Sequence, residues 1–483
     1  MSYLLFLVTI FSAVVPALTI HAADTFLPDG KLKPDDFAVL HAHDAKFTGD
    51  LRRGPSGQHG KFPVKNWRRA EQMLSWDIDV PEEDVYAVNV LVFRGNGQQI
   101  EAKVACAGQQ VLAALPAGER FWSRYALDGT LTLPKGKQTV TLQARSLTAA
   151  PEFQAEVMAV ELVRPAVRDH LHEAALKQRS DTTWMQQARF GIMSHWTSQS
   201  VPRNGPPKPY VQAAQDFDVE KLADQIKETG AGFFLMTTSH GELYFPAPIK
   251  ALDKILPGRT AQRDLVADLA GALNKRGIKL MLYYHIGATS DPAWLKASGF
   301  WDTDTTRIFA NWQAIIGEIG ERYGSTLAGW WFDDGSINYY YRSAPWEQLT
   351  RAAKAGFPQR VVGYNPWVLP SATEFQDYWC GEDNLDASVR GLLPAGGDGH
   401  LTGGSHKGQQ ACATVITEGD WVHTRRDSAV GKPRWNAEQL AALLKSFIER
   451  KNVPIFNLEI YQEGTLSTGT IEVFKEASGK VGK

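Results

Sequence analysis

From residue 190 onward the chain repeats one pattern, in which a short apolar run is followed by a longer stretch with apolar residues at helical spacing. Eight runs predict strands: FGIMSHW, GFFLMTT, KLMLYYH, GWWFDD, RVVGYN, DYWCGE, ATVITE and PIFNLEI. Stretches such as DVEKLADQIKETG and NAEQLAALLKSFIERKN predict amphipathic helices between them. Because alternating strands and helices form parallel sheets covered by helices, this pattern predicts an α/β fold, a (β/α)8 TIM-type barrel, over residues 182–483. A doubly wound sheet is the alternative, but no GxGxxG turn follows the first strand.

The chain before the barrel follows a different pattern. Residues 24–166 carry short β-rich runs separated by turns, among them VYAVNVLVFRG and KQTVTLQARS, which is typical of a β-sandwich. Trp67, Trp76 and Trp122 are candidates for a carbohydrate-binding face of this sandwich, although tryptophan in a small sandwich is more often part of the core. Residues 167–181, which include RDHLHEAALKQ, are expected to form a helical connector.

The N-terminus predicts export. Its sequence, MSYLLFLVTIFSAVVPALTIHAADTF, is an apolar run that ends in small residues near Ala22 and Ala23. We therefore expect a signal peptide over residues 1–23 and a secreted or periplasmic protein. Because no lysine or arginine precedes the apolar run, an uncleaved anchor is the alternative.

Composition narrows the class of partner. The 51 lysines and arginines nearly balance the 53 aspartates and glutamates, so charge gives no reason to expect nucleic acid or a membrane surface as partner. The 15 tryptophans and 14 tyrosines suit an oligosaccharide or polysaccharide, because aromatic rings stack on sugars. The cysteines Cys106, Cys380 and Cys412 are expected to be buried thiols, with a Cys380–Cys412 bridge as the alternative, and no metal or cofactor is indicated.

The residues expected at the carboxyl ends of the strands, where TIM barrels place their active sites, are rich in acids and aromatics. They are His195, Trp196, His240, Tyr283, Tyr284, His285, Trp331, Asp333, Asp334, Asn365, Trp367, Glu382, Asp383, Glu418, Trp421, Asn457 and Glu459. Carboxylates among aromatics and histidines suit glycosidic bond cleavage, in which one carboxyl attacks and another transfers the proton. No serine nucleophile elbow, HExxH motif or phosphate loop suggests another chemistry.

Asp333 and Asp334 are adjacent on one predicted strand, so their side chains point to opposite faces and only one can enter the barrel. Trp331 shares a face with Asp333. We therefore expect an aromatic wall beside Asp333, and we expect Asp334 to face the helices or a loop.

Six motifs, which occur in the same order as in the family, resemble the retaining α-L-fucosidases of glycoside hydrolase family twenty-nine. They are spread across most of residues 184–475. RFGIMSHWTSQSVP resembles RFGxFxHWGxxSVP, and FDVEKLADQIKETGAGFFLMTTSHG resembles FDxxxWxxxxKxAGAKYxxLTxKHHDG. The third predicted strand ends in LYYH where the family has LYYS. ERYGSTLAGWWFDDG resembles YGPxxxWxDG, QDYWCGE resembles DxxTxE, and VPIFNLEIYQEGTL resembles GNLLLNxGPxxDG.

The resemblance implies a role for each matched residue. Asp333 would be the nucleophile and Glu382 the acid/base, with Glu374 as its rival in the segment SATEFQDY. The residues expected to line the sugar pocket are His195, Trp196, His240, Tyr284, Trp331, Asn365 and Trp367. The implied activity is an exo-acting glycosidase that removes terminal α-L-fucosyl or related residues.

Two departures from the family pattern fall on positions that contact the sugar. Ser239 precedes His240 where the family has two adjacent histidines, and Asn365 follows the fifth strand in a segment without the arginine of many members. Loss of two such hydrogen-bonding groups weakens fucose recognition. A glycosidase for another sugar, or an inactive glycan-binding barrel, are therefore the alternative functions.

Overall fold

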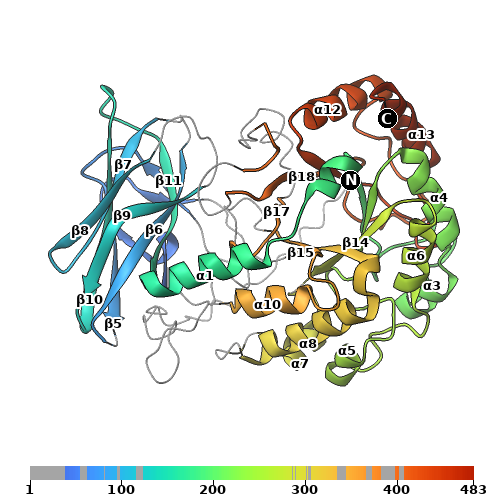
Figure 1. Cartoon of the computed structure of the whole chain (residues 1–483), viewed down its shortest axis with the longest axis horizontal. Coiled ribbons are helices and arrows are strands. Elements are labelled where there is room, and N and C mark those ends of the chain that lie inside the picture. Colours follow the sequence, from blue (N-terminus) through green and yellow to red (C-terminus); the bar gives the residue numbers. More distant parts are fainter. Residues whose placement is uncertain are drawn as a thin grey trace, which may run out of the picture.

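The computed structural model describes residues 38–54, 63–80, 82–94, 98–115, 123–285, 287–288, 290–300, 302, 306–333, 344–365, 373–381, 397–401 and 407–482. The predicted signal peptide and the candidates Trp122, Asp334, Trp367, Glu382 and Asp383 lie outside these residues. A β-rich N-terminal module and a larger mixed α/β module lie side by side, with helix α1 (Pro165–Gln178) connecting them (Figure 1). The predicted connector helix is therefore present.

The N-terminal module is built from antiparallel strands. They are β1 (Ala38–His41), β2 (Lys46–Phe47), β3 (Arg52–Arg53), β4 (Val64–Trp67), β5 (Met73–Val80), β6 (Asp84–Arg94), β7 (Ile100–Cys106), β8 (Gln109–Leu115), β9 (Ser123–Leu133), β10 (Gly136–Ser146) and β11 (Ala155–Val163). Their order is β2-β5-β10-β7-β8-β9-β6-β11-β4-β3, with β1 on β11. Trp67 and Trp76 are 0% and 5% exposed and belong to this module's core. These two tryptophans therefore form no exposed carbohydrate-binding face.

Within the described residues the second module contains eight parallel strands, one at each position predicted from the sequence. They are β12 (Gly191–Ser194), β13 (Phe233–Thr237), β14 (Lys279–His285), β15 (Leu327–Asp333), β16 (Val361–Tyr364), β17 (Tyr378–Trp379), β18 (Gln410–Ile416) and β19 (Val453–Asn457). Their order is β16-β15-β14-β13-β12-β19-β18-β17, so the first and last strands of the module are neighbours. The backbone N–H of Asp377 donates to the carbonyl of Val362 over 2.8 Å and links the two ends of the sheet. The strands therefore form a nearly closed parallel barrel, as expected, rather than an open doubly wound sheet.

Helices pack against the outside of the barrel (Figure 1). They are α2 (Thr183–Ala188), α3 (Tyr210–Asp216), α4 (Val219–Thr229), α5 (Lys250–Ile255), α6 (Leu265–Asn274), α7 (Pro292–Ser298), α8 (Thr306–Tyr323), α10 (Trp346–Ala353), α12 (Ala437–Glu449) and α13 (Thr468–Lys480). Several begin at side chains that accept the first backbone N–H groups, as Asp218 does for α4 and Asp264 for α6. None of the described helices is both long and apolar enough to cross a bilayer.

Alternation along the strands divides the apolar residues of the barrel into two cores. Tyr283 and Trp331 face the inner core, inside the barrel, whereas Tyr284 and Phe332 face the outer core, against the helices. A residue's position along its strand therefore decides whether its side chain enters the barrel or packs under a helix.

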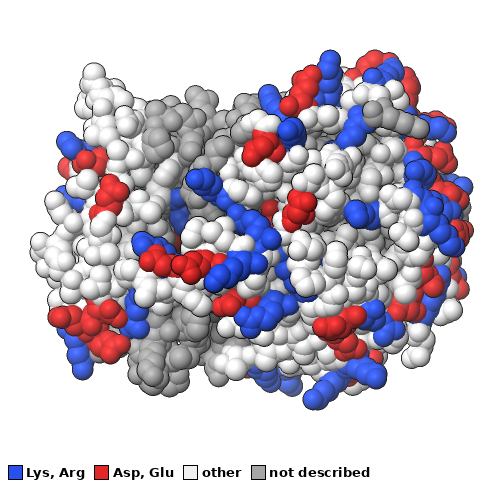
Figure 2. Space-filling view, viewed as in Figure 1, with Lys and Arg blue, Asp and Glu red and all other residues white. Residues whose placement is uncertain are grey.

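The three cysteines, all within the described residues, are buried thiols that form no disulfide, as predicted. Acidic and basic side chains are interspersed over the face of the molecule in Figure 2. This distribution agrees with the balanced composition.

Arg360 ties the helix layer to the barrel. Its side chain is completely buried and its guanidinium donates to five backbone carbonyls, those of Gly320, Gly324, Leu327, Ala353 and Ala355, over 2.7–2.9 Å. These carbonyls lie at or near the ends of α8 and α10 and at the start of β15. One guanidinium thus satisfies acceptors that helix ends leave without an intrahelical partner.

We expect Arg360→Met to lower the free energy of unfolding by about 3–5 kcal/mol, because several buried carbonyls lose their donor. Urea unfolding followed by circular dichroism measures the change. The matched control is Arg351→Met, which removes an exposed arginine paired with Glu347 and should change stability by less than about 1 kcal/mol. Equal effects of the two substitutions would contradict this role of Arg360.

Candidate active site

Asp333 is the last residue of β15, and its carboxylate is held inside the barrel mouth. Asn365, which follows β16, donates from Nδ2 to Oδ1 of Asp333 over 2.8 Å. The hydroxyl of Tyr283 on β14 donates to the other oxygen, Oδ2. The register pairs His285 with Asp333 and Tyr283 with Trp331, so these four side chains share one face of the sheet.

The surroundings of Asp333 keep its carboxylate ionised. Burial raises the pKa of a carboxyl, but here His285 and the hydrogen bonds from Tyr283 and Asn365 outweigh it and hold the pKa of Asp333 below its ordinary value. A buried, ionised carboxylate with oriented oxygens is the state that a nucleophile needs.

Three histidines lie around this carboxylate. The ring centroids of His195 and His240 are 5.5 Å apart, and those of His240 and His285 are 5.3 Å apart. His195 also lies 5.0 Å from the ring of Tyr283. Burial is the main cause that lowers the pKa of His195 to about 3 and that of His240 to about 4, and electrostatic repulsion by a neighbouring histidine is the second cause. Burial also lowers the pKa of His285. The rings are therefore neutral near pH 7, able both to donate and to accept hydrogen bonds.

The proton of His195 can be assigned from its neighbour. Asn457 donates from Nδ2 to the carbonyls of Asp420 and Trp421, which leaves its Oδ1 as the acceptor. His195 Nδ1 lies 2.8 Å from that oxygen and donates to it. The other ring nitrogen of His195, Nε2, therefore carries the lone pair.

His240, His285 and Asp333 are also close enough to suggest a metal site, since one ligand atom from each lies within 4.8 Å of the others. The donor chemistry does not fit a metal. His285 Nδ1 accepts the backbone N–H of Ala288 over 2.8 Å, so its Nε2 carries the proton and offers no lone pair. The group suits hydrogen bonding to a hydroxylated ligand instead.

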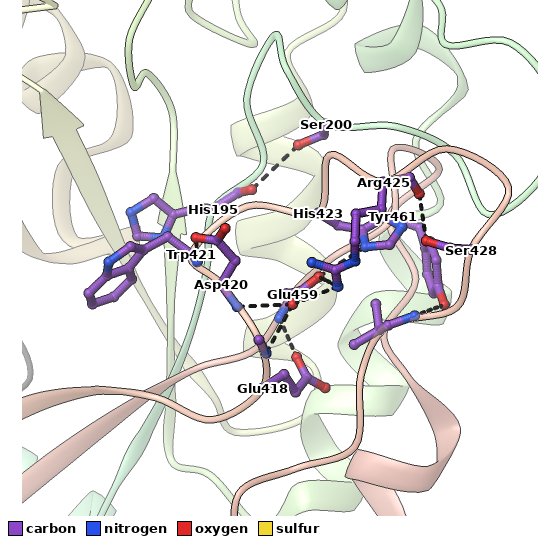
Figure 3. A network of polar contacts seen from close by, with 12 residues as sticks. His195, Ser200, Glu418, Asp420, Trp421, His423, Arg425, Ser428, Glu459 and Tyr461 are labelled. Atoms are coloured by element: carbon purple, nitrogen blue, oxygen red, sulfur yellow. Dashed lines mark hydrogen bonds and ion pairs between the residues drawn. The ribbon is translucent and has the colours of Figure 1, made fainter. Parts of the chain in front are cut away.

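A buried network fixes the loop after β18 (Figure 3). The carboxylate of Glu459, completely buried after β19, accepts the backbone N–H groups of Gly419 and Asp420 over 3.1 Å. It also contacts Nδ1 of His423 at 2.9 Å and accepts from Arg425 over 2.8 Å. One carboxylate therefore holds both ends of this loop.

The loop brings an aromatic ring to the site. Trp421 is half-buried, and its ring centroid lies 5.1 Å from that of His195 (Figure 3). Asp420 beside it is exposed, and its charge acts on His240. The network thus places an aromatic wall and an exposed carboxylate at the rim of the cluster.

Five of the predicted site residues are brought together: Asp333, His195, His240, Trp331 and Asn365. Trp331 stacks on Tyr283 with ring centroids 5.0 Å apart, and it is only 1% exposed. It therefore supports the site from below.

Trp196 and Tyr284 are not part of the cluster. Trp196 packs against Tyr210 and Phe217 under the helices and donates to the carbonyl of Gln462. Tyr284 also belongs to the outer core. Each is the immediate neighbour of an inward residue, so alternation turns it away from the barrel. We therefore remove both from the predicted sugar pocket.

Glu374 lies at the other end of the barrel. It precedes β17 by four residues, so it is at the amino end of a strand parallel to β15, whereas Asp333 is at a carboxyl end. Its carboxylate contacts Nδ1 of His172 on α1 at 2.5 Å. The rival acid/base assignment to Glu374 is therefore wrong, because its carboxyl cannot reach a ligand held at Asp333.

Tyr283 and His285 also face the site, although the sequence analysis lists them only as strand-end residues and not as catalytic or sugar-binding residues. The signal that identifies them is spacing: they alternate with Tyr284 and are paired in register with Trp331 and Asp333. Tertiary contacts that no local sequence pattern shows give a place in the site to Trp421, Asn457 and Glu459.

Glu418 provides a pH-dependent test of the network. Its carboxyl accepts the backbone N–H of Glu459 and the hydroxyl of Thr470, both over 2.5 Å. Burial raises the pKa of Glu418 from its ordinary 4.5 to about 7. The folded protein therefore binds a proton that the unfolded chain releases above pH 4.5, so this stabilisation is present below pH 4.5 and is lost as the pH rises to about 7.

We expect wild type to lose on the order of 3 kcal/mol of unfolding free energy relative to Glu418→Gln between pH 4.5 and 7. Urea unfolding of both proteins across this range measures the difference. Glu449→Gln, which removes an exposed glutamate, is the control and should follow wild type. A constant difference between wild type and Glu418→Gln would contradict a protonated Glu418.

Comparisons with known proteins relate part of the chain to one family. Residues 208–391, which include His240, His285, Asp333 and Asn365, match the family model described as alpha-L-fucosidase. Tissue alpha-L-fucosidase of Bos taurus is 28% identical over 171 residues, a match that covers 28% of this chain and 36% of the bovine protein. The protein of the same name from Homo sapiens is 28% identical over 160 residues, covering 26% of this chain and 34% of the human protein.

The chain therefore spans about a third of the length of these curated relatives. Among solved structures, an alpha-L-fucosidase from Lactobacillus casei in complex with alpha-L-fucose product is similar with a TM-score of 0.45 and 17% identity, covering 62% of this chain and 97% of that chain. Over residues 208–391 this chain is α-L-fucosidase-like.

Proposed function

We propose that this protein is a retaining exo-glycosidase that hydrolyses terminal α-L-fucosyl, or closely related α-L-sugar, residues of oligosaccharides or polysaccharides. The observation that carries the proposal is Asp333, a buried carboxylate oriented by Tyr283 and Asn365 and surrounded by neutral histidines. The match of residues 208–391 to the alpha-L-fucosidase family supports the substrate class.

In this proposal Asp333 attacks the anomeric carbon and forms a covalent glycosyl-enzyme. Tyr283 and Asn365 hold the attacking carboxylate in one orientation, so little reorganisation is needed when the bond forms. Water then releases the sugar with its anomeric configuration retained.

A second carboxyl must protonate the leaving oxygen and later activate water. Glu382, which lies outside the described residues, remains our first candidate, because in sequence it comes three residues after the end of β17 and so after the carboxyl end of a barrel strand. Asp420 is the second candidate, since it is exposed at the rim and its charge acts on His240.

The glycone is recognised by neutral groups in this proposal. His195 offers a lone pair on Nε2, and His240 presents a half-exposed ring between the other two histidines. The half-buried ring of Trp421 supplies an apolar face for stacking on a sugar. Trp367, outside the described residues, stays a predicted contact. Such a pocket suits an uncharged sugar such as L-fucose or L-galactose.

The proposal also assigns a role to each part of the chain. We assign residues 182–483 to a TIM-type catalytic barrel and residues 24–166 to a β-sandwich whose packing supports the barrel. The helix α1 contacts both β6 and α10, so it joins the two modules physically. The sequence pattern of residues 1–23 supports cleavage of a signal peptide and export.

We expect wild type to release nitrophenol from an aryl α-L-fucoside or α-L-galactoside, and Asp333→Asn to lower kcat/KM at least about a thousandfold, because the nucleophile is lost. Glu374→Gln is the matched control and should keep activity within about twofold, because its carboxyl lies at the far end of the barrel.

Full activity in Asp333→Asn would refute the nucleophile. The contrasting outcome is that wild type hydrolyses none of the aryl glycosides and that glycans bind equally well with and without Asp333→Asn. That result would favour an inactive glycan-binding barrel. Hydrolysis of a glycoside of another sugar alone would change the proposed substrate class and leave the proposed mechanism unchanged.

A further inference from the structure

A row of side chains crosses four neighbouring strands of the N-terminal module. The strand order β6-β11-β4-β3 places these strands side by side. The antiparallel register pairs Phe93 with Glu156 and Arg52 with Lys65, and residues paired in this way have their side chains on the same face. Glu156 also contacts Lys65, with 3.3 Å between Oε1 and Nζ. The row therefore runs without a break from Phe93 on β6 to Arg52 on β3.

A β-bulge lies in the middle of this row. Two residues of β4, Lys65 and Asn66, face the single residue Glu156 of β11. Asn66 has a φ of +72°, a left-handed conformation that asparagine adopts more readily than most residues. Bulges of this kind are frequent next to active sites, because they redirect a side chain. Here the bulge places an ammonium group and an amide beside the same carboxylate.

The row lines a hollow of about 200 Å³. Asn66, Trp67, Arg68 and Gln154 also contribute to its wall. The backbone N–H of Phe153 donates to the carbonyl of Arg68 over 2.9 Å and so holds the segments that flank the hollow together. Pockets for complete drug-sized ligands occupy about 300–1,000 Å³. The hollow therefore suits one charged substituent and the edge of a sugar ring.

The acids near the hollow are already paired. Glu156, the acid among the described lining residues, forms its ion pair with Lys65. Asp50 accepts from the amide of Asn66 over 3.1 Å and pairs with Arg69 at 3.1 Å. Each of these two carboxylates therefore has a cation of its own.

Two guanidinium groups at the hollow have no acidic partner in the part of the chain that the structure describes. They belong to Arg52 and Arg68, and both side chains are exposed. Arg68 donates to the amide oxygen of Asn66. Arg52 lies directly opposite Lys65, and like charges at such paired positions repel each other. An anion bound between these cations would replace this repulsion with attraction.

A buried donor at the hollow also lacks an acceptor. Trp67 lines the hollow and is 0% exposed, and its indole N–H has no acceptor within the described residues. The ring packs edge-on against Phe153, with centroids 5.7 Å apart. Buried polar groups without a partner are uncommon in proteins. The hollow thus has more hydrogen-bond donors and positive charges than acceptors, which is the environment that an oxyanion needs.

We propose that this hollow is a non-catalytic binding site for an oxyanion group of an acidic polysaccharide, either a sulfate ester or a uronate carboxylate. Arg52 and Arg68 bind the oxyanion. The amides of Asn66 and Gln154 hydrogen-bond the neighbouring hydroxyls, and the half-buried ring of Phe93 offers an apolar face to the sugar. The choice of a polysaccharide rests on the proposed glycosidase function. The site goes beyond that function, because it holds the polymer on the module that does not cleave it.

The charge of the chain favours a polysaccharide over a nucleic acid or an anionic membrane. The formal net charge is −2. Nucleic acids and anionic bilayers attract proteins through many basic groups over an extended surface. The hollow instead combines two cations that have no acidic partner with amides and an aromatic ring. This combination matches a sugar that carries one charged substituent.

The test is binding of the full chain to immobilised polysaccharides at low ionic strength. Dextran sulfate and polygalacturonate are the anionic probes, and dextran is the neutral one. We expect wild type to bind an anionic probe and not dextran. Arg52→Gln with Arg68→Gln should weaken this binding at least about tenfold, because two charged hydrogen-bond donors are lost. Stronger binding of dextran sulfate would identify the sulfate ester as the ligand group, and stronger binding of polygalacturonate would identify the carboxylate.

The matched control is Lys135→Gln with Lys137→Gln. It removes the same charge from two exposed lysines between β9 and the start of β10. This double variant should bind the anionic probes within about twofold of wild type, because surface substitutions away from a site have small effects. Thermal unfolding checks that both double variants are folded.

Equal weakening by the two double variants, or a wild type that binds neither anionic probe, would overturn the inference. Binding of duplex DNA or of anionic phospholipid vesicles as strongly as the polysaccharides would also overturn it, because a general polyanion surface would then explain the binding. The failure of the proposed function is distinguishable, since these measurements need no hydrolysis. A protein that binds without turnover would refute only the activity, and one that hydrolyses without binding would refute only this site.

Discussion

A carboxylate buried in a protein must be surrounded by hydrogen-bond donors, and the site depends on how Asp333 obtains them. One donor is Tyr283 on β14, and the other is Asn365, which follows β16. These two strands flank β15. Parallel register places Asn365 level with Asp333, and it places Tyr283 level with Trp331, two residues earlier on the same inward face. A shift of one residue on β14 would turn Tyr283 and His285 toward the helices and replace them with Tyr284.

The remaining parts of the barrel serve this centre in two ways. Burial lowers the pKa values of the histidine rings and keeps them uncharged near pH 7, where they offer hydrogen-bonding groups beside Asp333. The Glu459 network, at the ends of β18 and β19, holds the loop that places Trp421 against His195. Both arrangements use buried side chains at or just after strand ends.

The sequence pattern predicts the barrel strands well, because strand and helix periodicities differ clearly in each unit. Asp333 was also predictable, since Trp331 and Asp333 lie two residues apart on one strand. Trp196 and Tyr284 match the family motifs but face the outer core, because each lies one residue from an inward side chain. The acid/base prediction for Glu374 is wrong because this residue precedes its strand and so lies at the end of the barrel opposite to Asp333. The contacts of Glu459 and Ala288 depend on loop conformation, which periodicity does not encode.

If Asp333 is the nucleophile, it forms a covalent bond to the sugar, and this intermediate can be trapped. Wild type would be incubated with an α-L-fucosyl fluoride carrying a second fluorine next to the anomeric carbon, which slows release of the sugar, and then digested for mass spectrometry. We expect a fluorofucosyl adduct on the peptide containing Asp333, localised to that residue. In an enzyme that turns over α-L-fucosides, an adduct on another carboxyl, or hydrolysis with inversion and no adduct, would contradict it.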